Sequence, residues 1–239
     1  MEIKTDALVL RATDYKENDK ILTLFSPALG KITAGIRGVR KPKAKLNFAA
    51  QPFCFAEYML AERADRYTVV NAYLYDGFYP LRTDVTRYYA ACTVTEICDR
   101  LLVEDGENRA LFVAAVEALK NLALTDGDCA EIVLTFSLVA LHEAGYMLDA
   151  DGCGVCGGEI GENAYFDFGA GYFTCADCAS GTRASRSTYH VLRKCAGLDY
   201  DETGTDDGRK RALRLVRAYL TEKTEEEYPC FSELIRLYE

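Results

Sequence analysis

The chain has 239 residues, of which 49% are hydrophobic and 27% charged, so it is long enough to bury one large core or two ordinary ones. Its start, Met-Glu-Ile-Lys-Thr-Asp, carries charges where a signal peptide has an apolar core, and no run of about 18 apolar residues occurs. These features argue against disordered, secreted and membrane-spanning proteins and predict a cytoplasmic protein whose ten cysteines are reduced.

The net charge of -9 is distributed unevenly along the chain. Residues 1–45 contain ten Lys or Arg against five Asp or Glu, a balance of +5, whereas the remaining residues contain 18 against 32, a balance of -14. An asymmetry of this size predicts a region that binds a polyanion beside an acidic region.

The first 80 residues consist of short alternating or β-branched runs separated by turn signals, which is typical of strands. The expected strands are Ile3–Thr13, Lys20–Phe25, Lys31–Val39, Phe53–Leu60 and Tyr67–Ala72. Five short strands with no room for helical crossovers favour a small closed barrel, and the OB-fold is the commonest barrel of this kind.

After Pro80 the hydrophobic period changes from two to about 3.6, which predicts helices that begin from a cap at Thr83 or Asp84. The first two helices are expected to bury one stripe each, formed by Val85, Tyr89, Cys92, Ile97 and Leu101, and by Phe112, Val116 and Leu119. A third helix, Glu131–Tyr146, is apolar nearly all round and is expected at the centre of the helical part.

Three further helices are predicted: one near Ser187–Cys195, one ending at Leu220, and a short closing one. An acidic linker, Asp199–Gly208, is expected between the first two of these. The predicted fold class is therefore α+β, with an OB-fold barrel over residues 1–80 and a helical domain over residues 81–239.

Two C-x2-C pairs, Cys153/Cys156 and Cys175/Cys178, are separated by 18 residues, which is the spacing of a four-cysteine zinc site. Two intervening residues let both sulfurs of a pair reach one tetrahedral ion. The glycines around the first pair are expected to allow the tight turns. A short hairpin within residues 150–182 is expected to cover the site with the aromatic side chains of Tyr165, Phe166, Phe168, Tyr172 and Phe173. The alternative is that these cysteines are reduced structural residues or a redox pair.

Four thiolates close the coordination sphere of zinc, so one structural ion and no catalysis are expected. His142-Glu143 lacks the second histidine of a zinc protease helix, and no G-x-x-x-x-G-K-[ST] phosphate loop occurs. A metal-dependent hydrolase is therefore a weak alternative. The other six cysteines are dispersed within apolar patterns and are expected in cores, at positions 54, 92, 98, 129, 195 and 230.

Residues 20–56 contain no Asp or Glu. Alternation along the third strand places Lys31 and Arg37 on one outward face, about 20 Å apart at roughly 3.3 Å per residue. The following loop continues this line with Arg40, Lys41, Lys43 and Lys45. Such a stripe is suited to a phosphate backbone, whereas the alternative is a merely solvated charged face.

A second basic feature consists of Lys210, Arg214 and Arg217, which share one face of a predicted helix while Leu213 and Val216 take the other. A cationic rim beside an apolar groove would suit an acidic amphipathic peptide. An ordinary surface helix is the alternative, and the one that the pattern favours.

Several segments resemble the bacterial RecO family of DNA repair and recombination mediators. They are Asp6–Arg11 with Lys20–Phe25, Gly30–Ile32 with Arg37–Lys43, Cys153–Gly157, Tyr165–Phe168 and Cys175–Cys178, and the order of elements agrees over nearly the whole chain.

The resemblance implies a non-enzymatic protein whose N-terminal OB-fold binds single- and double-stranded DNA and whose helical domain carries the zinc module. It also implies that the protein anneals complementary strands and, with RecR, promotes RecA loading onto DNA coated with single-stranded DNA-binding protein, at the bacterial nucleoid. By position, the DNA-binding role falls on Lys31, Arg37, Arg40, Lys41, Lys43 and Lys45. The acidic tail of single-stranded DNA-binding protein would dock on the helical domain.

One segment departs from the family pattern. A basic Leu-Lys-Ser type segment is common near the C-terminus of the family, whereas residues 225–232 here read Glu-Glu-Glu-Tyr-Pro-Cys-Phe-Ser. The helix with Lys210 and Arg214 is therefore the better candidate for partner binding. The alternative to a DNA-binding mediator is an interaction or regulatory protein in which a zinc ribbon reads a partner without direct DNA binding.

Overall fold

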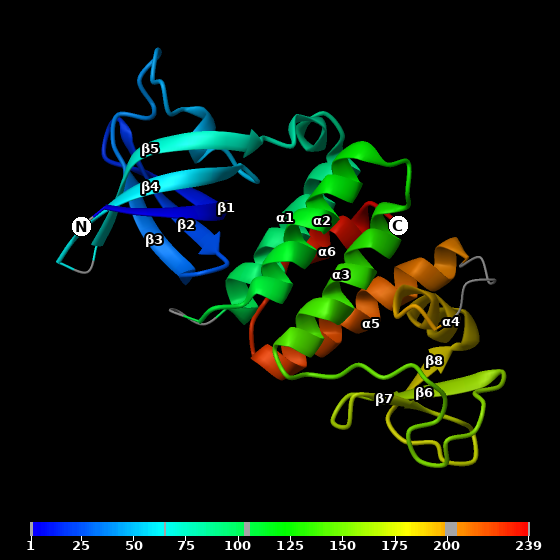
Figure 1. Cartoon of the computed structure of the whole chain (residues 1–239). Coiled ribbons are helices and arrows are strands. Elements are labelled where there is room, and N and C mark those ends of the chain that lie inside the picture. Colours follow the sequence, from blue (N-terminus) through cyan, green and yellow to red (C-terminus); the bar gives the residue numbers. More distant parts are fainter. Residues whose placement is uncertain (1, 65, 103–105, 199–204, 239) are drawn as a thin grey trace. The chain divides into compact units, whose positions relative to one another are not determined.

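The computed structural model describes residues 2–64, 66–102, 106–198 and 205–238 (Figure 1). The chain forms two compact units, Met1–Leu124 and Thr125–Glu239. Among the described residues, the first unit contains a barrel and two α-helices, and the second contains four α-helices and a small sheet. This division groups the first two helices with the barrel, whereas the pattern of hydrophobic residues predicts a change of domain after residue 80.

The strands of the first unit form a closed five-stranded barrel. They are β1 (Glu2–Tyr15), β2 (Asp19–Ser26), β3 (Gly30–Ile36), β4 (Phe55–Arg63) and β5 (Arg66–Asp76). Their order around the barrel is β1-β2-β3-β5-β4, with β3 and β5 parallel and every other pair antiparallel. This is the OB-fold that the strand spacing predicts.

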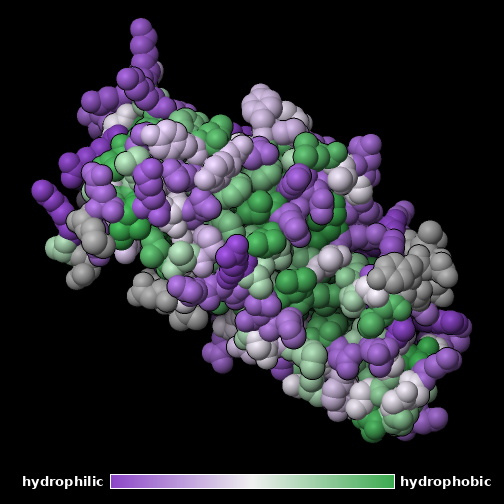
Figure 2. Space-filling model, viewed as in Figure 1, coloured by the Kyte–Doolittle hydropathy of each residue, from purple (hydrophilic) through white to green (hydrophobic). Residues whose placement is uncertain are grey.

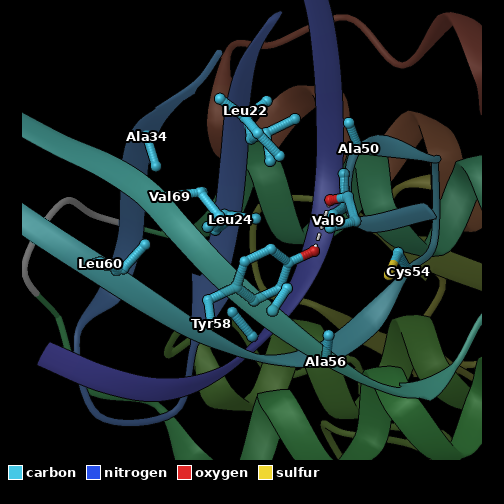
Figure 3. Packing of buried hydrophobic residues seen from close by; sticks show 14 of the residues in the cluster. Val9, Leu22, Leu24, Ala34, Ala50, Cys54, Ala56, Tyr58, Leu60 and Val69 are labelled. Carbon is cyan, nitrogen blue, oxygen red and sulfur yellow. Dashed lines mark hydrogen bonds between the residues drawn. The ribbon is translucent and has the colours of Figure 1, made fainter. Parts of the chain in front are cut away.

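Small and aliphatic side chains fill the barrel around one large residue, Tyr58, which is fully buried (Figure 3). Its hydroxyl donates to the carbonyl of Ala49 at 2.8 Å, so the polar end of the ring is satisfied inside the core. Ala49 belongs to a short 3-10 helix, Phe48–Ala50, in the connection between β3 and β4. The hydrogen bond therefore anchors this connection to the barrel.

Two predicted strands extend beyond the observed ones because of the local backbone. The third strand ends at Ile36 rather than at Val39, because Gly38 adopts a φ of +64° that turns the chain. The fourth strand begins at Phe55 rather than at Phe53, whose φ is +66°.

The helices of the first unit are α1 (Val85–Leu101) and α2 (Arg109–Leu124). The predicted cap is confirmed at Asp84, whose side chain accepts from the backbone of Arg87 at 2.8 Å. The predicted stripe on α1 is only partly correct, because Val85 is 57% exposed. Ile97 of the predicted stripe is buried, and Ala90, Ala91, Val94 and Cys98 line the buried face together with it. Alanines contribute little to a hydrophobic pattern, and a stripe inferred from large residues misses them.

The second unit contains α3 (Cys129–Glu143), β6 (Asn163–Asp167), β7 (Tyr172–Thr174), β8 (Thr182–Ser185), α4 (Arg186–Cys195), α5 (Asp206–Thr224) and α6 (Pro229–Arg236). Within it, α5 packs against α3, α4 and α6. The three strands form an antiparallel sheet in the order β7-β6-β8. The predicted hairpin is thus confirmed, and a third strand that the sequence pattern did not indicate is added to it.

The acidic linker predicted at Asp199–Gly208 falls largely on residues 199–204, which lie outside the described part of the chain. Its last residues are helical, because Thr205 caps α5 by accepting from the backbone of Gly208 at 3.1 Å. Within the described ranges, no helix has the length and apolar character needed to cross a membrane.

Candidate metal centre and nucleic-acid interface

The four cysteines of the two C-x2-C pairs converge, with their sulfur atoms all within 4.8 Å of one another. Cys156 Sγ and Cys175 Sγ, one from each pair, lie 3.8 Å apart. A tetrahedral ion with Zn–S bonds of about 2.3 Å holds neighbouring sulfurs about 3.8 Å apart. The arrangement therefore has the donor number, donor type and spacing of a closed metal site.

The turn that carries Cys153 and Cys156 depends on two glycines for different reasons. Gly157 has a φ of +70° and donates to the carbonyl of Cys153 at 2.8 Å, which closes the turn. Gly154 is needed for space, since a Cβ built there would lie 2.4 Å from the ring of Tyr172. Tyr172 thus packs directly on the turn, as expected of an aromatic residue that covers the site.

The environment of the sulfurs favours a thiolate at Cys153. Burial by itself raises the pKa of this thiol, but backbone N–H groups of Cys156, Cys175 and Val155 donate to the sulfur and bring its pKa down to about 6. Hydrogen bonds with the thiols of Cys156 and Cys175 raise the pKa of Cys178 to about 12. A cation at the centre of the four sulfurs would favour the thiolate at each of them.

The sheet beside the cysteines is packed onto α4 and α5 by aromatic contacts. The ring of Phe173 lies 5.1 Å from that of Tyr189 on α4, and the ring of Phe166 lies 5.4 Å from that of Tyr219 on α5, both edge to face. The hydroxyl of Tyr189 also accepts from the backbone of Gly152, the residue before the first cysteine, at 3.1 Å. The sheet beside the cysteines is therefore part of the core of the second unit, whereas Cys156 itself is exposed. Tyr189 and Tyr219 were not predicted from the sequence, because they lie on helices outside the cysteine segment.

The remaining six cysteines take the role expected of core residues. Cys54 and Cys98 are buried, and the other four are half-buried. Burial raises the pKa of Cys54 and of Cys98, and it raises the pKa of Cys195 to about 11. These thiols are therefore protonated at neutral pH and are poor nucleophiles.

The predicted basic stripe separates into two groups of residues with different surroundings. Four residues are exposed and form no ion pair with any residue that the structure describes: Arg37, Lys41, Lys43 and Lys45. They lie at the end of β3 and in the loop that projects from the barrel between β3 and β4 (Figure 1), where hydrophilic side chains cover the surface (Figure 2). These four residues form what we call the basic loop.

Lys31 and Arg40 instead have partners within the first unit. Lys31 Nζ donates to the carbonyl of Asp99 on α1 at 2.7 Å and lies 3.7 Å from its carboxylate. Alternation along β3 does place Lys31 on the outward face, as predicted, but that end of the strand is not solvated, since the side chain is only 22% exposed. Arg40 pairs with Asp14 at 3.2 Å and donates to the carbonyl of Glu17 at 3.2 Å, so it holds the loop against the turn between β1 and β2.

The basic face predicted on α5 is also divided. Arg217 donates to Ser232 on α6 at 2.8 Å, and Lys210 is half-buried. Arg214 lines a groove of about 290 Å³ between β8 and α5, together with two arginines that the helical pattern did not single out, Arg183 and Arg211. The apolar part of this groove is formed by Phe166, Phe168, Ala184, Leu215 and Ala218.

Two family models match the chain, each over one region. The model described as "Recombination protein O N terminal" matches residues 1–78, and "Recombination protein O C terminal" matches residues 82–229. The chain belongs to the RecO family. The boundary between the two matches lies close to residue 80, where the hydrophobic pattern changes.

Curated relatives named "DNA repair protein RecO" agree with this membership of the RecO family. One from Myxococcus xanthus is 34% identical over 221 residues, which cover 90% of this chain and 89% of the relative. Another, from Pelotomaculum thermopropionicum, is 30% identical over 241 residues, which cover 98% of this chain and 93% of the relative. A third, from Desulforamulus reducens, is 36% identical over 195 residues, covering 80% and 75%. The predicted family and its link to DNA repair are thereby confirmed, and the observed barrel and helices confirm the predicted fold class.

Proposed function

We propose that this RecO-family protein acts by binding DNA rather than by catalysis, and that the basic loop makes the principal phosphate contacts. The observation that carries this proposal is that Arg37, Lys41, Lys43 and Lys45 are exposed and that no acidic residue within the described ranges forms an ion pair with them. Each phosphate that such a cation neutralises releases condensed counterions, so the contact adds affinity and makes it dependent on salt. Lys31 and Arg40 hold the fold that presents this loop.

The test is a titration of single-stranded oligonucleotide against salt with a variant in which Lys41, Lys43 and Lys45 are changed to Gln. Three lost contacts reduce the log–log slope by about 2, at roughly 0.7 per contact on single strands. The matched control is Lys120→Gln, which removes an exposed lysine on α2. The proposal fails if the triple variant keeps the slope of the unchanged protein, or if Lys120→Gln lowers it by the same amount per lysine.

We further propose that the metal is one structural zinc ion held by Cys153, Cys156, Cys175 and Cys178. The support is the set of four converging sulfurs, which leaves no position for a water or a substrate. Bound zinc would supply a cross-link between the two turns and no reactive group. The cross-linked turns would in turn stabilise α4 and α5, because aromatic residues of the adjacent sheet pack against both helices.

A pair of glycine variants tests the zinc site without changing a ligand. Gly154→Ala places a methyl group against the ring of Tyr172 at 2.4 Å, so we expect displacement of the first turn, less than one zinc per chain and a lower Tm. Gly161→Ala is the control, since no atom lies within 4 Å of its added Cβ. One tightly held zinc with an unchanged Tm in Gly154→Ala, or protein that is zinc-free and fully folded as purified, would contradict the proposal.

From the family resemblance we propose that the protein anneals complementary strands and, with RecR, helps to load RecA onto DNA coated with single-stranded DNA-binding protein. The acidic tail of the latter would dock in the groove between β8 and α5, with its carboxylates near Arg183, Arg211 and Arg214. Support comes from the combination of cationic and apolar lining in that groove. Lys210 and Arg217 remain predicted contacts beside it.

The docking site is tested by fluorescence anisotropy with a labelled peptide of that tail. Leu215→Glu puts a negative charge into the apolar lining and is expected to abolish binding, whereas Lys120→Gln, which removes an exposed positive charge on α2, serves as the control. Unchanged peptide affinity in Leu215→Glu would rule out this groove. If the unchanged protein binds the peptide but no DNA, the alternative of a zinc-containing interaction module without direct DNA binding is favoured.

A further inference from the structure

A second feature of the barrel surface lies next to the basic loop, on the outward face of β2, β3 and β5. It is a cavity of about 440 Å³, a size typical of ligand pockets. The strand register brings Ile21, Gly35 and Thr68 into one row across this face. The floor is shallow at the centre of the row because Gly35 has no side chain.

The walls of this cavity combine an aromatic ring with cations. Tyr15 contributes the ring and is 46% exposed, whereas Tyr67, which also borders the cavity, packs partly against the barrel core. Lys16, Lys20, Arg37 and Arg66 contribute four positive charges. Among the described residues of the lining, the one acidic side chain is that of Asp19, which accepts the backbone N–H of Gly38 at 2.8 Å and so helps to hold the loop.

We propose that this cavity binds one unpaired base of single-stranded DNA, stacked against Tyr15, with the flanking phosphates beside Lys16 and Arg37. This inference rests on the proposed DNA-binding function and adds a contact that reads the base rather than the phosphate. Aromatic rings stack on every base, so the contact favours single strands without selecting a sequence. The bases of a duplex are stacked on one another and do not reach such a pocket. The position of Lys16, with its Nζ 5.2 Å from the centroid of the Tyr15 ring, places a cation next to the stacking surface.

Gly35 offers a way to close the pocket without removing a charge. Its φ lies outside the left-handed region, and an added Cβ would meet only the carbonyl oxygen of Tyr67, at 4.0 Å. Valine is favoured in strands, so Gly35→Val fits the fold and fills the floor of the cavity. Tyr15→Leu removes the stacking ring at an exposed position, and Tyr15→Phe retains it.

The experiment measures the affinity of the whole chain for two ligands, an oligothymidylate and an abasic phosphodiester strand of the same length, and compares the two values. The unchanged protein and Tyr15→Phe are expected to bind the oligothymidylate about tenfold more tightly, the order of magnitude of one stacked base. Gly35→Val and Tyr15→Leu are expected to lose most of this preference while keeping their affinity for the abasic strand, the salt slope and the Tm.

The possible outcomes separate this inference from the proposed function. Equal binding of both strands by the unchanged protein, or full preference in both Gly35→Val and Tyr15→Leu, overturns the base pocket alone. Binding of neither strand, or a salt slope that Lys43→Gln leaves unchanged, counts against DNA binding by the basic loop itself.

Discussion

Lys31 and Lys43 both lie within residues 20–56, which contain no Asp or Glu. We expect replacement by methionine to lower stability at Lys31 and to weaken DNA binding at Lys43. Lys31 Nζ donates to the carbonyl of Asp99 at 2.7 Å, and their side chains are 22% and 21% exposed. Asp99 lies in the last turn of α1, where carbonyl groups have no partner within the helix and carry partial negative charge. A hydrogen bond from a charged donor contributes about 1.5 to 3 kcal/mol. Because methionine retains the aliphatic part of lysine, we expect Lys31→Met to lower the free energy of unfolding by about 2 kcal/mol.

Lys43 is exposed and unpaired in the described ranges, so Lys43→Met is expected to change stability by less than about 0.5 kcal/mol. The assays are urea unfolding followed by far-ultraviolet circular dichroism, since the chain has no tryptophan, and DNA titration against salt. Lys43→Met should lower the slope for single strands by about 0.7, and Lys31→Met should leave it unchanged. The reasoning is refuted if Lys31→Met lowers the slope as Lys43→Met does while stability is unaltered.

Three further predictions concern the scaffold. Arg40→Ala removes hydrogen bonds to the turn between β1 and β2 and should lower the free energy of unfolding by about 1 kcal/mol. Lys41→Ala should cause no measurable change, and equal effects of the two variants in urea unfolding would contradict a structural role for Arg40. Tyr58→Phe leaves the carbonyl of Ala49 unpaired in the core and should cost about 1 to 3 kcal/mol, a value that an unchanged Tm would exclude. The Ser180 hydroxyl and the Ala170 amide donate to Asp167 and lower the pKa of its carboxyl. The ionised carboxylate should therefore stabilise the fold at and above pH 3.8, its ordinary pKa, and this stabilisation should be lost as the pH falls through the lowered pKa; an NMR titration of Asp167 with a midpoint at or above 3.8 would contradict this.

The barrel, the cysteine site and the basic loop could be predicted from the sequence, because each depends on residues that are close together along the chain. Strand alternation, turn residues and the absence of room for helices predict the five-stranded barrel, because a pleated strand alternates faces whatever its partners are. The spacing of Cys153, Cys156, Cys175 and Cys178 predicts their convergence, because two intervening residues bring both sulfurs of a pair to one side of a turn. The exposed cations of the basic loop also follow from composition, since lysines in a loop with no acidic neighbour have few partners within reach.

What the sequence could not determine depends on contacts between segments that are distant along the chain. Lys31 and Arg37 are equivalent by alternation, yet α1 lies over one end of β3 in the first unit and pairs Lys31 with Asp99, while Arg37 stays exposed. Gly154 suggests a tight turn, but only the register of β6 and β7 shows that it makes room for the ring of Tyr172. A charge or a glycine has no fixed role until its neighbours are placed, because interaction energies depend on distance and burial. Tertiary structure therefore decided which of these basic residues stay exposed and which are paired within the fold.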